Sequence, residues 1–193
     1  MLPFYLFYIV CYQVPELIVR PSLPDRWVVL AVVFVFTFLL PTLGTGVLYW
    51  FGQLDSLLLR ERAQRPLPLL LAAFSFGMAA TVLTQRSIFD VLLGQMMVGM
   101  VLTVFLTFLI SLSWKISAHG VGVGGAGTLL LLLYLNTPHS PVLLWWLLGA
   151  VVVAGAVLSA RLVLAAHTPA QVWAGLALGA GVVLGIGIGV SST

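Results

Sequence analysis

Two histidines lie close to basic side chains in a chain that has few charges of any kind. His119 follows Lys115 and Ser117, and His167 follows Arg161 by six residues. Lysine, arginine and serine can hold an anion together, and the planar fork of arginine matches two phosphate oxygens. A histidine next to a bound phosphate can act as a nucleophile or as a proton donor. These residue types and spacings therefore indicate chemistry on a phosphate group.

The sequence around His167 also predicts how its ring is held. Pro169 is expected to begin a helix, because proline is favoured at the first helical position. Gln171 then lies one helical turn beyond His167 and is expected to hold the second ring nitrogen. The pair His167 and Gln171 is therefore a candidate catalytic unit.

Two other apolar segments begin with basic residues. Lys115 to His119 opens one of them, and the first turn of a helix offers unpaired N–H groups that suit a phosphate. Arg65 directly precedes Pro66 at the start of another, which favours a fixed anion contact. Arg62 is either a second phosphate ligand or a loop charge that contacts lipid headgroups. A lone histidine at His119 would more often be an interfacial ring, but the neighbouring cations favour catalysis.

The composition excludes an ordinary soluble domain. Of 193 residues, 62% are hydrophobic and only 7% are charged, whereas soluble domains carry roughly 25% charged residues. The net charge of +3 is better explained by loop charges and anion contacts than by nucleic acid. Cys11 is the single cysteine, so no intrachain disulfide is possible, and packing is its expected role. No cleavable signal peptide is expected, and the first apolar stretch is interpreted as a retained span.

The expected fold is all-α, a polytopic membrane bundle of six to seven transmembrane helices that forms a single domain over residues 1–193. Each span needs about 20 apolar residues. Seven apolar segments meet or approach this length, at about 2–19, 27–51, 66–83, 88–112, 120–135, 142–160 and 171–190. The first segment contains Glu16 and the fifth is short, so either is a candidate for a re-entrant or shallow helix.

Every second connection between spans must lie on the same side of the membrane. The connections after the second, fourth and sixth segments define side A, and the other connections define side B. Side A collects most of the candidate site residues, from three loops that are far apart in sequence, and this convergence is the main functional indication. Side A contains Arg60, Glu61, Arg62, Arg65, Lys115, Ser117, His119, Arg161 and His167; side B contains Arg20, Asp25, Arg26, Arg86 and His139.

Small residues indicate close helix packing near both histidines. Gly175 and Gly179 are four residues apart, as are Gly181 and Gly185, and such spacing lets two membrane helices approach closely. The run over 120–125 matches G-x-G-x-x-G, but no strand is expected before it, so a dinucleotide site is not indicated. Close packing is the better interpretation of both patterns.

At these residues the chain resembles the type 2 phosphatidic acid phosphatase family of membrane lipid phosphatases. The family signatures are K-x6-R-P, P-S-G-H and S-R-x5-H-x3-D, in that order. The chain offers Arg65-Pro66, then Ser117-Ala118-His119, then Arg161-x5-His167-x3-Gln171, over about residues 58–175. The order, parity and spacing of the three matches agree with the family.

The chain departs from the signatures at several positions. Leu58 stands where the family has lysine, Ile116 and Ala118 replace proline and glycine, and Ala160 replaces serine. Gln171 replaces the aspartate that holds the nucleophilic histidine. An amide can accept a hydrogen bond from the ring, but it cannot stabilise an imidazolium as a carboxylate does.

The resemblance implies a phosphatase acting on a lipid phosphate or diphosphate monoester through a phosphohistidine. His167 would attack phosphorus, and His119 would protonate the leaving oxygen. The phosphate would contact Arg65, Ser117 and Arg161, with Arg60, Arg62 or Lys115 supplying the missing lysine charge. The alternative, suggested by Gln171, is a non-catalytic protein that binds or translocates a lipid phosphate.

The expected partners are membrane lipids and a phosphorylated lipid substrate, with no nucleic acid. No metal ion or other cofactor is expected, because the histidines stand in separate loops with almost no carboxylate nearby. The resemblance and a small excess of cations on side B favour a bacterial cytoplasmic membrane with the site facing outward.

Overall fold

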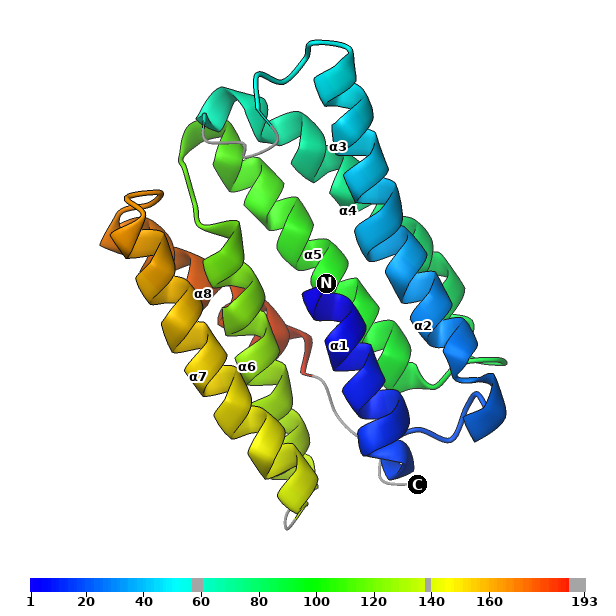
Figure 1. Ribbon diagram of the computed structural model, residues 1–193. Coiled ribbons are helices and arrows are strands. Elements are labelled where there is room, and N and C mark those ends of the chain that lie inside the picture. Colours follow the sequence, from blue (N-terminus) through cyan, green and yellow to red (C-terminus); the bar gives the residue numbers. More distant parts are fainter. Residues whose placement is uncertain (57–60, 138–139, 188–193) are drawn as a thin grey trace.

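The fold is a bundle of helices packed side by side (Figure 1). The computed structural model describes residues 1–56, 61–137 and 140–187, and within these ranges all regular structure is helical. Six helical segments in the described part of the chain are long and apolar enough to cross a membrane. The protein is therefore an all-α membrane bundle, as its composition predicts.

The six spans follow one another through short connections. The first combines two helices and a π-helical turn into one segment, and the other five are single helices. Their bounds are α2 (Trp27–Phe34), the π-helical turn Val35–Leu39 and α3 (Leu40–Trp50) for the first span, then α4 (Pro66–Leu83), α5 (Val91–Ser113), α6 (Ala118–Asn136), α7 (Pro141–Val163) and α8 (Pro169–Ile186). The fifth expected segment, over 120–135, is thus a full-length helix and is not re-entrant.

The first apolar segment, expected to span over 2–19, forms only a short helix. α1 (Leu2–Tyr8) continues as a π-helical turn (Ile9–Gln13) and ends at Val14, where φ is −134°. Pro15 follows and has no N–H with which to extend the helix. At about 1.5 Å per residue, Leu2–Gln13 rises about 18 Å, short of a core about 30 Å thick. α1 instead packs inside the bundle, against α2 and α6.

A buried arginine stabilises the end of this short helix. The guanidinium of Arg26 donates to the carbonyl oxygens of Cys11 (2.7 Å), Pro15 (3.1 Å) and Ile18 (2.8 Å). Those carbonyls lie where the helical hydrogen-bond pattern stops, and a buried carbonyl without a donor costs free energy. Arg26 is only 5% exposed, so it is not the loop charge that the sequence suggested for side B.

The π-helical turn inside the first span has an identifiable cause. Pro41 lacks an N–H, and in a turn with i→i+5 pairing its expected acceptor would be the carbonyl oxygen of Phe36. That oxygen instead accepts a hydrogen bond from the hydroxyl of Ser75 on α4, at 2.5 Å. The irregular turn and α4 are therefore joined by a hydrogen bond within the apolar part of the bundle.

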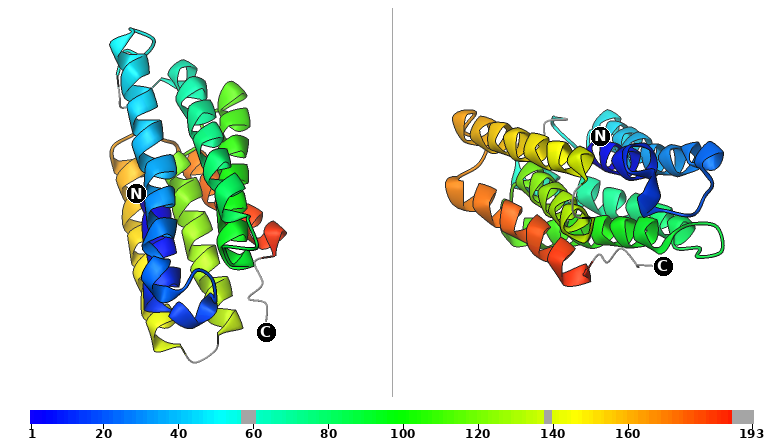
Figure 2. Two further views of the ribbon diagram at one scale, coloured as in Figure 1. Left: turned by 90° about the vertical axis from the view of Figure 1, so that its right-hand side faces the viewer. Right: turned by 90° about the horizontal axis from the view of Figure 1, so that it is seen from below.

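The ends of the helices define two faces of the bundle. The connections α3–α4, α5–α6 and α7–α8 lie at the same end (Figure 1), as the parity of the spans predicts. Figure 2 shows α7 at the edge of the bundle, next to α6 and α8, and α7 is the least buried of the six spans. The face formed by these three connections is side A.

Candidate functional site

The site on side A begins with two arginines that contact the end of α5 and the α5–α6 connection. A short 3-10 turn (Arg62–Gln64) leads into Arg65, which directly precedes Pro66 at the start of α4. The Nη1 of Arg65 donates to the carbonyl oxygen of Ile116 at 3.2 Å. The Nη1 of Arg62 donates to the carbonyl oxygen of Leu112 at 2.7 Å. Arg65 therefore reaches the connection that carries His119, whereas Arg62 contacts the last turn of α5.

Ser117 joins the connection to the start of α8. Its backbone N–H donates to the carbonyl oxygen of Gln171 at 3.2 Å. Its hydroxyl accepts from the N–H of Gly120 at 3.2 Å and so caps α6, and the residue is fully buried. The hydroxyl therefore stabilises the helix start in this structure, which differs from the phosphate contact expected from the sequence.

Glycines bring α6 and α8 together just below this hydrogen bond. A Cβ atom added to Gly175 would lie 2.5 Å from the carbonyl oxygen of Ser117, and one added to Gly179 would overlap the carbonyl oxygen of Val121. Gly120 and Gly124 face α8 in the same way, since a Cβ on Gly120 would lie 2.8 Å from the Val172 oxygen. The 120–125 run and the pair Gly175 and Gly179 are thus packing residues, as expected.

The second small-residue pair has a different environment. Within the described ranges, nothing lies within 4 Å of a Cβ added to Gly181 or to Gly185. The close-packing interpretation of the last span therefore applies to Gly175 and Gly179 only, among the contacts within this chain.

α7 ends in a turn that places Arg161 beside His119. The N–H of Ala166 donates to the carbonyl oxygen of Arg161 (3.2 Å), and that of Ala165 donates to Leu162 (3.0 Å). These two bonds form a Schellman motif with Ala165 at the left-handed position, where φ is 48°. A left-handed conformation costs a non-glycine residue roughly 1–2 kcal/mol. The connection between Arg161 and His167 therefore has a strained backbone.

Arg161 contacts the first histidine directly. Its Nη2 lies 3.1 Å from Nε2 of His119. Because a guanidinium only donates hydrogen bonds, Nε2 must accept and the ring of His119 must carry its proton on Nδ1. His119 is thus a neutral ring in this arrangement.

Arg161 also retains an unused donor. Its Nε is buried and has no hydrogen-bond partner among the described residues. Such a buried donor is costly unless a partner occupies the site.

The second histidine is held by the first turn of α8. Nδ1 of His167 lies 3.1 Å from Oε1 of Gln171, as the sequence predicts. The same Oε1 accepts from the backbone N–H of Thr168 at 3.2 Å, and the hydroxyl of Thr168 accepts from the N–H of Gln171 at 3.4 Å. Thr168 and Gln171 therefore form a capping box at the start of α8. The sequence contained this signal, because T-x-x-Q with a proline directly after the threonine, here Pro169, is typical of a helix start.

The electrostatic environment favours a neutral His167. Burial lowers the pKa of His167 most. The hydrogen bond that its ring donates to Gln171 raises the pKa, and the cations Arg65, Lys115 and Arg161 lower it further. The charges that act on this ring, among the described residues, are therefore all positive. A neutral imidazole beside three cations suits a site for an anion.

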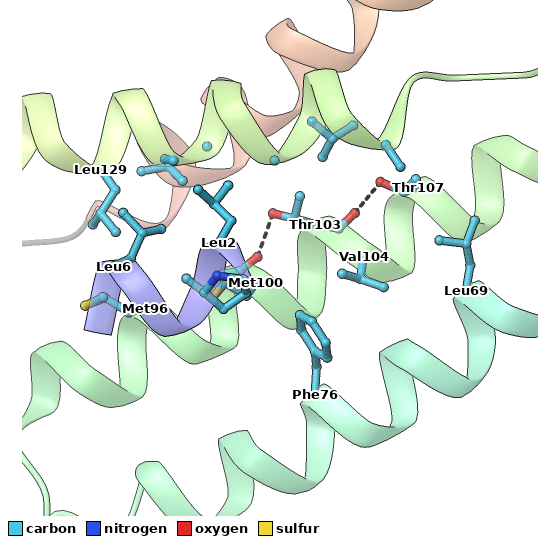
Figure 3. Close-up of a pocket in the computed structure, with 18 residues that line it drawn as sticks. Leu2, Leu6, Leu69, Phe76, Met96, Met100, Thr103, Val104, Thr107 and Leu129 are labelled. Atoms are coloured by element: carbon cyan, nitrogen blue, oxygen red, sulfur yellow. Dashed lines mark hydrogen bonds between the residues drawn. The ribbon is translucent and has the colours of Figure 1, made fainter. Parts of the chain in front are cut away.

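An apolar cavity of about 210 Å³ lies below this cluster, within the bundle (Figure 3). Its lining includes Leu69, one turn beyond Arg65, and Ala118, the residue before His119. The hydroxyls of Thr103 and Thr107 also line it, but both donate to carbonyl oxygens of their own helix, α5. The cavity is larger than the engineered apolar cavities of about 150 Å³ that take up benzene. The wall therefore offers apolar contact and no polar ligand.

The structure thus brings together the residues Arg65, Lys115, His119, Arg161, His167 and Gln171 on side A. The described ranges contain no group of three or more His, Cys, Asp or Glu side chains that would hold a metal ion. Sequence reasoning did not assign a role to Thr168, Ala165 or the cavity. Leu58, Arg60 and His139 lie outside the described residues.

Comparisons of the chain with family models, curated proteins and solved structures found no match. The resemblance to the lipid phosphatases accordingly remains a prediction from the three signatures.

Proposed function

We propose that this protein is a membrane phosphatase that removes phosphate from a lipid phosphate or diphosphate. The observation that carries the proposal is the position of His167 among Arg65, Lys115 and Arg161, with its Nδ1 held by Gln171. Three cations without a nearby carboxylate favour a phosphate group, and phosphoryl transfer requires mainly positioning and charge stabilisation.

In the proposed reaction, the phosphate binds between Arg65, Lys115 and Arg161. Nε2 of His167 attacks phosphorus and forms a P–N bond while the bond from phosphorus to the lipid oxygen breaks. Water then attacks the phosphohistidine, which releases inorganic phosphate and regenerates the imidazole. Two bonds to phosphorus are thus exchanged in two steps, with no change in oxidation state.

The leaving lipid oxygen needs a proton, and His119 is the proposed donor. In the structure its Nε2 accepts from Arg161, so the ring has no acidic proton in that arrangement. A bound phosphate competes for the guanidinium, which also has a buried Nε without a partner among the described residues. When Arg161 turns to the phosphate, Nε2 of His119 becomes available to take up a proton and to deliver it to the leaving group.

The apolar cavity supports a lipid as the substrate. Its lining includes Leu69, one turn beyond Arg65, and Ala118, the residue before His119, and it is bounded by α1, α4, α5, α6 and α8. A hydrocarbon chain placed there would keep its phosphate at the level of the cluster.

Phosphate release from purified protein tests the proposal. Lipid phosphates in detergent or vesicles are expected to release inorganic phosphate, and His167→Ala is expected to abolish the release. Arg86→Ala is the control, because Arg86 is exposed on side B. Equal release by wild type and His167→Ala would remove His167 as the nucleophile.

A second candidate function is binding or translocation of a lipid phosphate without hydrolysis. The amide at Gln171 favours this candidate, since binding needs the cations but not an activated histidine. Gln171→Asp separates the two functions. A large gain in phosphate release supports a weak enzyme, whereas tight binding with no release by either form supports the non-catalytic function.

We place the protein in a bacterial cytoplasmic membrane with side A facing outward, on the basis of the resemblance alone. Arg26 is buried, so it does not count among the exposed loop cations of side B. Cysteines at the exposed positions Gln53 (side A) and Gln85 (side B), in a Cys11→Ala background, test the orientation by labelling in intact cells. Labelling at position 85 but not at position 53 would reverse the orientation.

A further inference from the structure

The side-chain oxygen of Gln171 contacts two different nitrogen atoms. Nδ1 of His167 lies 3.1 Å from Oε1, and the backbone nitrogen of Thr168 lies 3.2 Å from the same atom. The side chain is thus shared between a ring that can either donate or accept and a backbone group that can only donate.

The backbone contact decides which end of the amide faces the ring. The N–H of Thr168 needs an acceptor, and the Gln171 amide offers one only at its oxygen. That oxygen has two lone pairs, and its second contact is Nδ1 of His167, which must then donate. The proton of a neutral His167 is accordingly on Nδ1, and Nε2 carries the lone pair.

Gln171 is also fixed through its own backbone. Its N–H donates to the hydroxyl of Thr168 at 3.4 Å, and its carbonyl oxygen accepts from the N–H of Ser117 at 3.2 Å. Contacts on both sides of the residue therefore hold the amide in place at the start of α8.

We propose that Gln171 is a positioning residue that selects the Nδ1–H tautomer of His167, with the N–H of Thr168 setting the direction of the amide. The consequence for catalysis rests on the proposed function: only this tautomer presents a lone pair on Nε2 to an incoming phosphate. An amide does not titrate, so the selection does not depend on the protonation of Gln171. This distinguishes Gln171 from a carboxylate, which would select the same tautomer and also stabilise the charged ring.

The tautomer can be measured without any assay of activity. The full chain is labelled with ¹⁵N-histidine in lipid nanodiscs, and ¹⁵N NMR at a pH where the ring is neutral separates protonated from unprotonated ring nitrogens. The spectrum of His167→Ala assigns the signals of His167 among those of the three histidines. Wild type is expected to show a protonated Nδ1 and an unprotonated Nε2. A protonated Nε2 in the wild type would overturn the proposal.

Three variants test whether the side chain of Gln171 is responsible. Gln171→Leu removes the acceptor and is expected to lose the tautomer preference. Gln171→Glu keeps an acceptor for both N–H groups, as in a T-x-x-E capping box, and is expected to restore it. Thr168→Ala removes the capping hydroxyl but keeps the backbone N–H, and its tautomer is expected to match the wild type.

The variants also exclude a purely structural effect. An unchanged tautomer in Gln171→Leu would overturn the proposal. Loss of the preference in Thr168→Ala as well would assign the effect to the helix cap and would likewise overturn it.

Activity provides a second readout. Gln171→Leu is expected to lower kcat by about 10²-fold with little change in KM, as for a misplaced reacting group. Gln171→Glu is expected to move the acidic limb of the pH profile upward, because a carboxylate favours the charged ring. If the wild type shows the expected tautomer but no phosphatase activity, the proposed function fails and the tautomer selection stands. If the wild type is active but carries a protonated Nε2, the proposed function stands and the tautomer selection fails.

Discussion

Arg161 on α7 and His119 on α6 are in direct contact, with 3.1 Å between Nη2 and Nε2. The contact joins the second and third sequence signatures in space. It also occupies a guanidinium that belongs to the proposed phosphate site. Anion binding and the His119 contact therefore compete for the same group, and this competition makes the site sensitive to substitutions at Arg161.

Arg161→Ala is expected to weaken the binding of inorganic phosphate or vanadate. Hydrogen bonds to charged groups contribute about 1.5–3 kcal/mol, which corresponds to about 10- to 100-fold in affinity. The phosphate affinity of Arg161→Lys should lie between those of the wild type and Arg161→Ala, because lysine keeps the charge but has no planar fork. Titration calorimetry or inhibition of phosphate release measures the change, with the exposed side B residue Arg86 as an alanine control. Equal losses at Arg86 and Arg161 would contradict this assignment.

The acidic limb of the pH profile is expected to depend on Lys115. Its charge, after burial and together with Arg65 and Arg161, lowers the pKa of His167. Since the nucleophile must be unprotonated, a lowered pKa keeps the wild type active at lower pH. Lys115→Gln removes one positive charge, raises the pKa and should move the acidic limb of kcat/KM to higher pH. An unchanged limb would show that Lys115 does not act on His167.

The packing of α6 against α8 is expected to control the geometry of the site. Gly179→Ala would force a Cβ against the carbonyl oxygen of Val121, whereas Gly181→Ala meets nothing within 4 Å. Overpacking of this kind costs about 1–3 kcal/mol. The free energy of unfolding and the activity of Gly179→Ala should both fall, and Gly181→Ala should match the wild type in both measurements.

Filling the apolar cavity should lower kcat/KM for long-chain substrates and leave kcat/KM for short ones unchanged. Ala126 lines the cavity on α6, and Ala126→Leu adds bulk to it. The bilayer interior is as apolar as the cavity. Moving the hydrocarbon chain of a substrate from the bilayer into the cavity therefore gains dispersion contacts but little hydrophobic free energy. Losing about ten carbon contacts costs about 1–2 kcal/mol, or about tenfold in kcat/KM.

A short water-soluble phosphomonoester provides the reference substrate for that experiment, and its hydrolysis should not change. Gly127→Leu adds similar bulk where a Cβ meets nothing within 4 Å, so it serves as the matched control. A uniform loss for short and long substrates would contradict a role of the cavity in binding the chain.

The sequence predicted the spans well, because apolar runs and helix starts are local signals. Pro66, Pro141 and Pro169 begin helices where proline is favoured, and Ser117, Ser140 and Thr168 cap theirs. Parity alone then predicted that Arg65, His119 and His167 share a face. The short α1 was harder to predict, because its apolar run continues past the point where Pro15 ends the helix.

The details of the site depended on contacts that no local pattern encodes. Nothing in the sequence assigns Arg26 to the carbonyls of Cys11 and Ile18, or joins Arg161 to Nε2 of His119. Such pairings follow from how α6, α7 and α8 pack, which hydrophobic periodicity does not specify. The capping box was different, since Thr168 and Gln171 have the required spacing in the sequence itself.

The placement of α7 has a consequence for how the membrane acts on the site. Arg161 is carried by α7, which has the smallest buried share of the six described spans, so most of the surface of α7 is available for contact with lipid. Helices adjust their tilt when the thickness of the surrounding bilayer changes. A tilt of α7 would move the guanidinium relative to His119, so that bilayer thickness becomes one of the variables that set anion affinity.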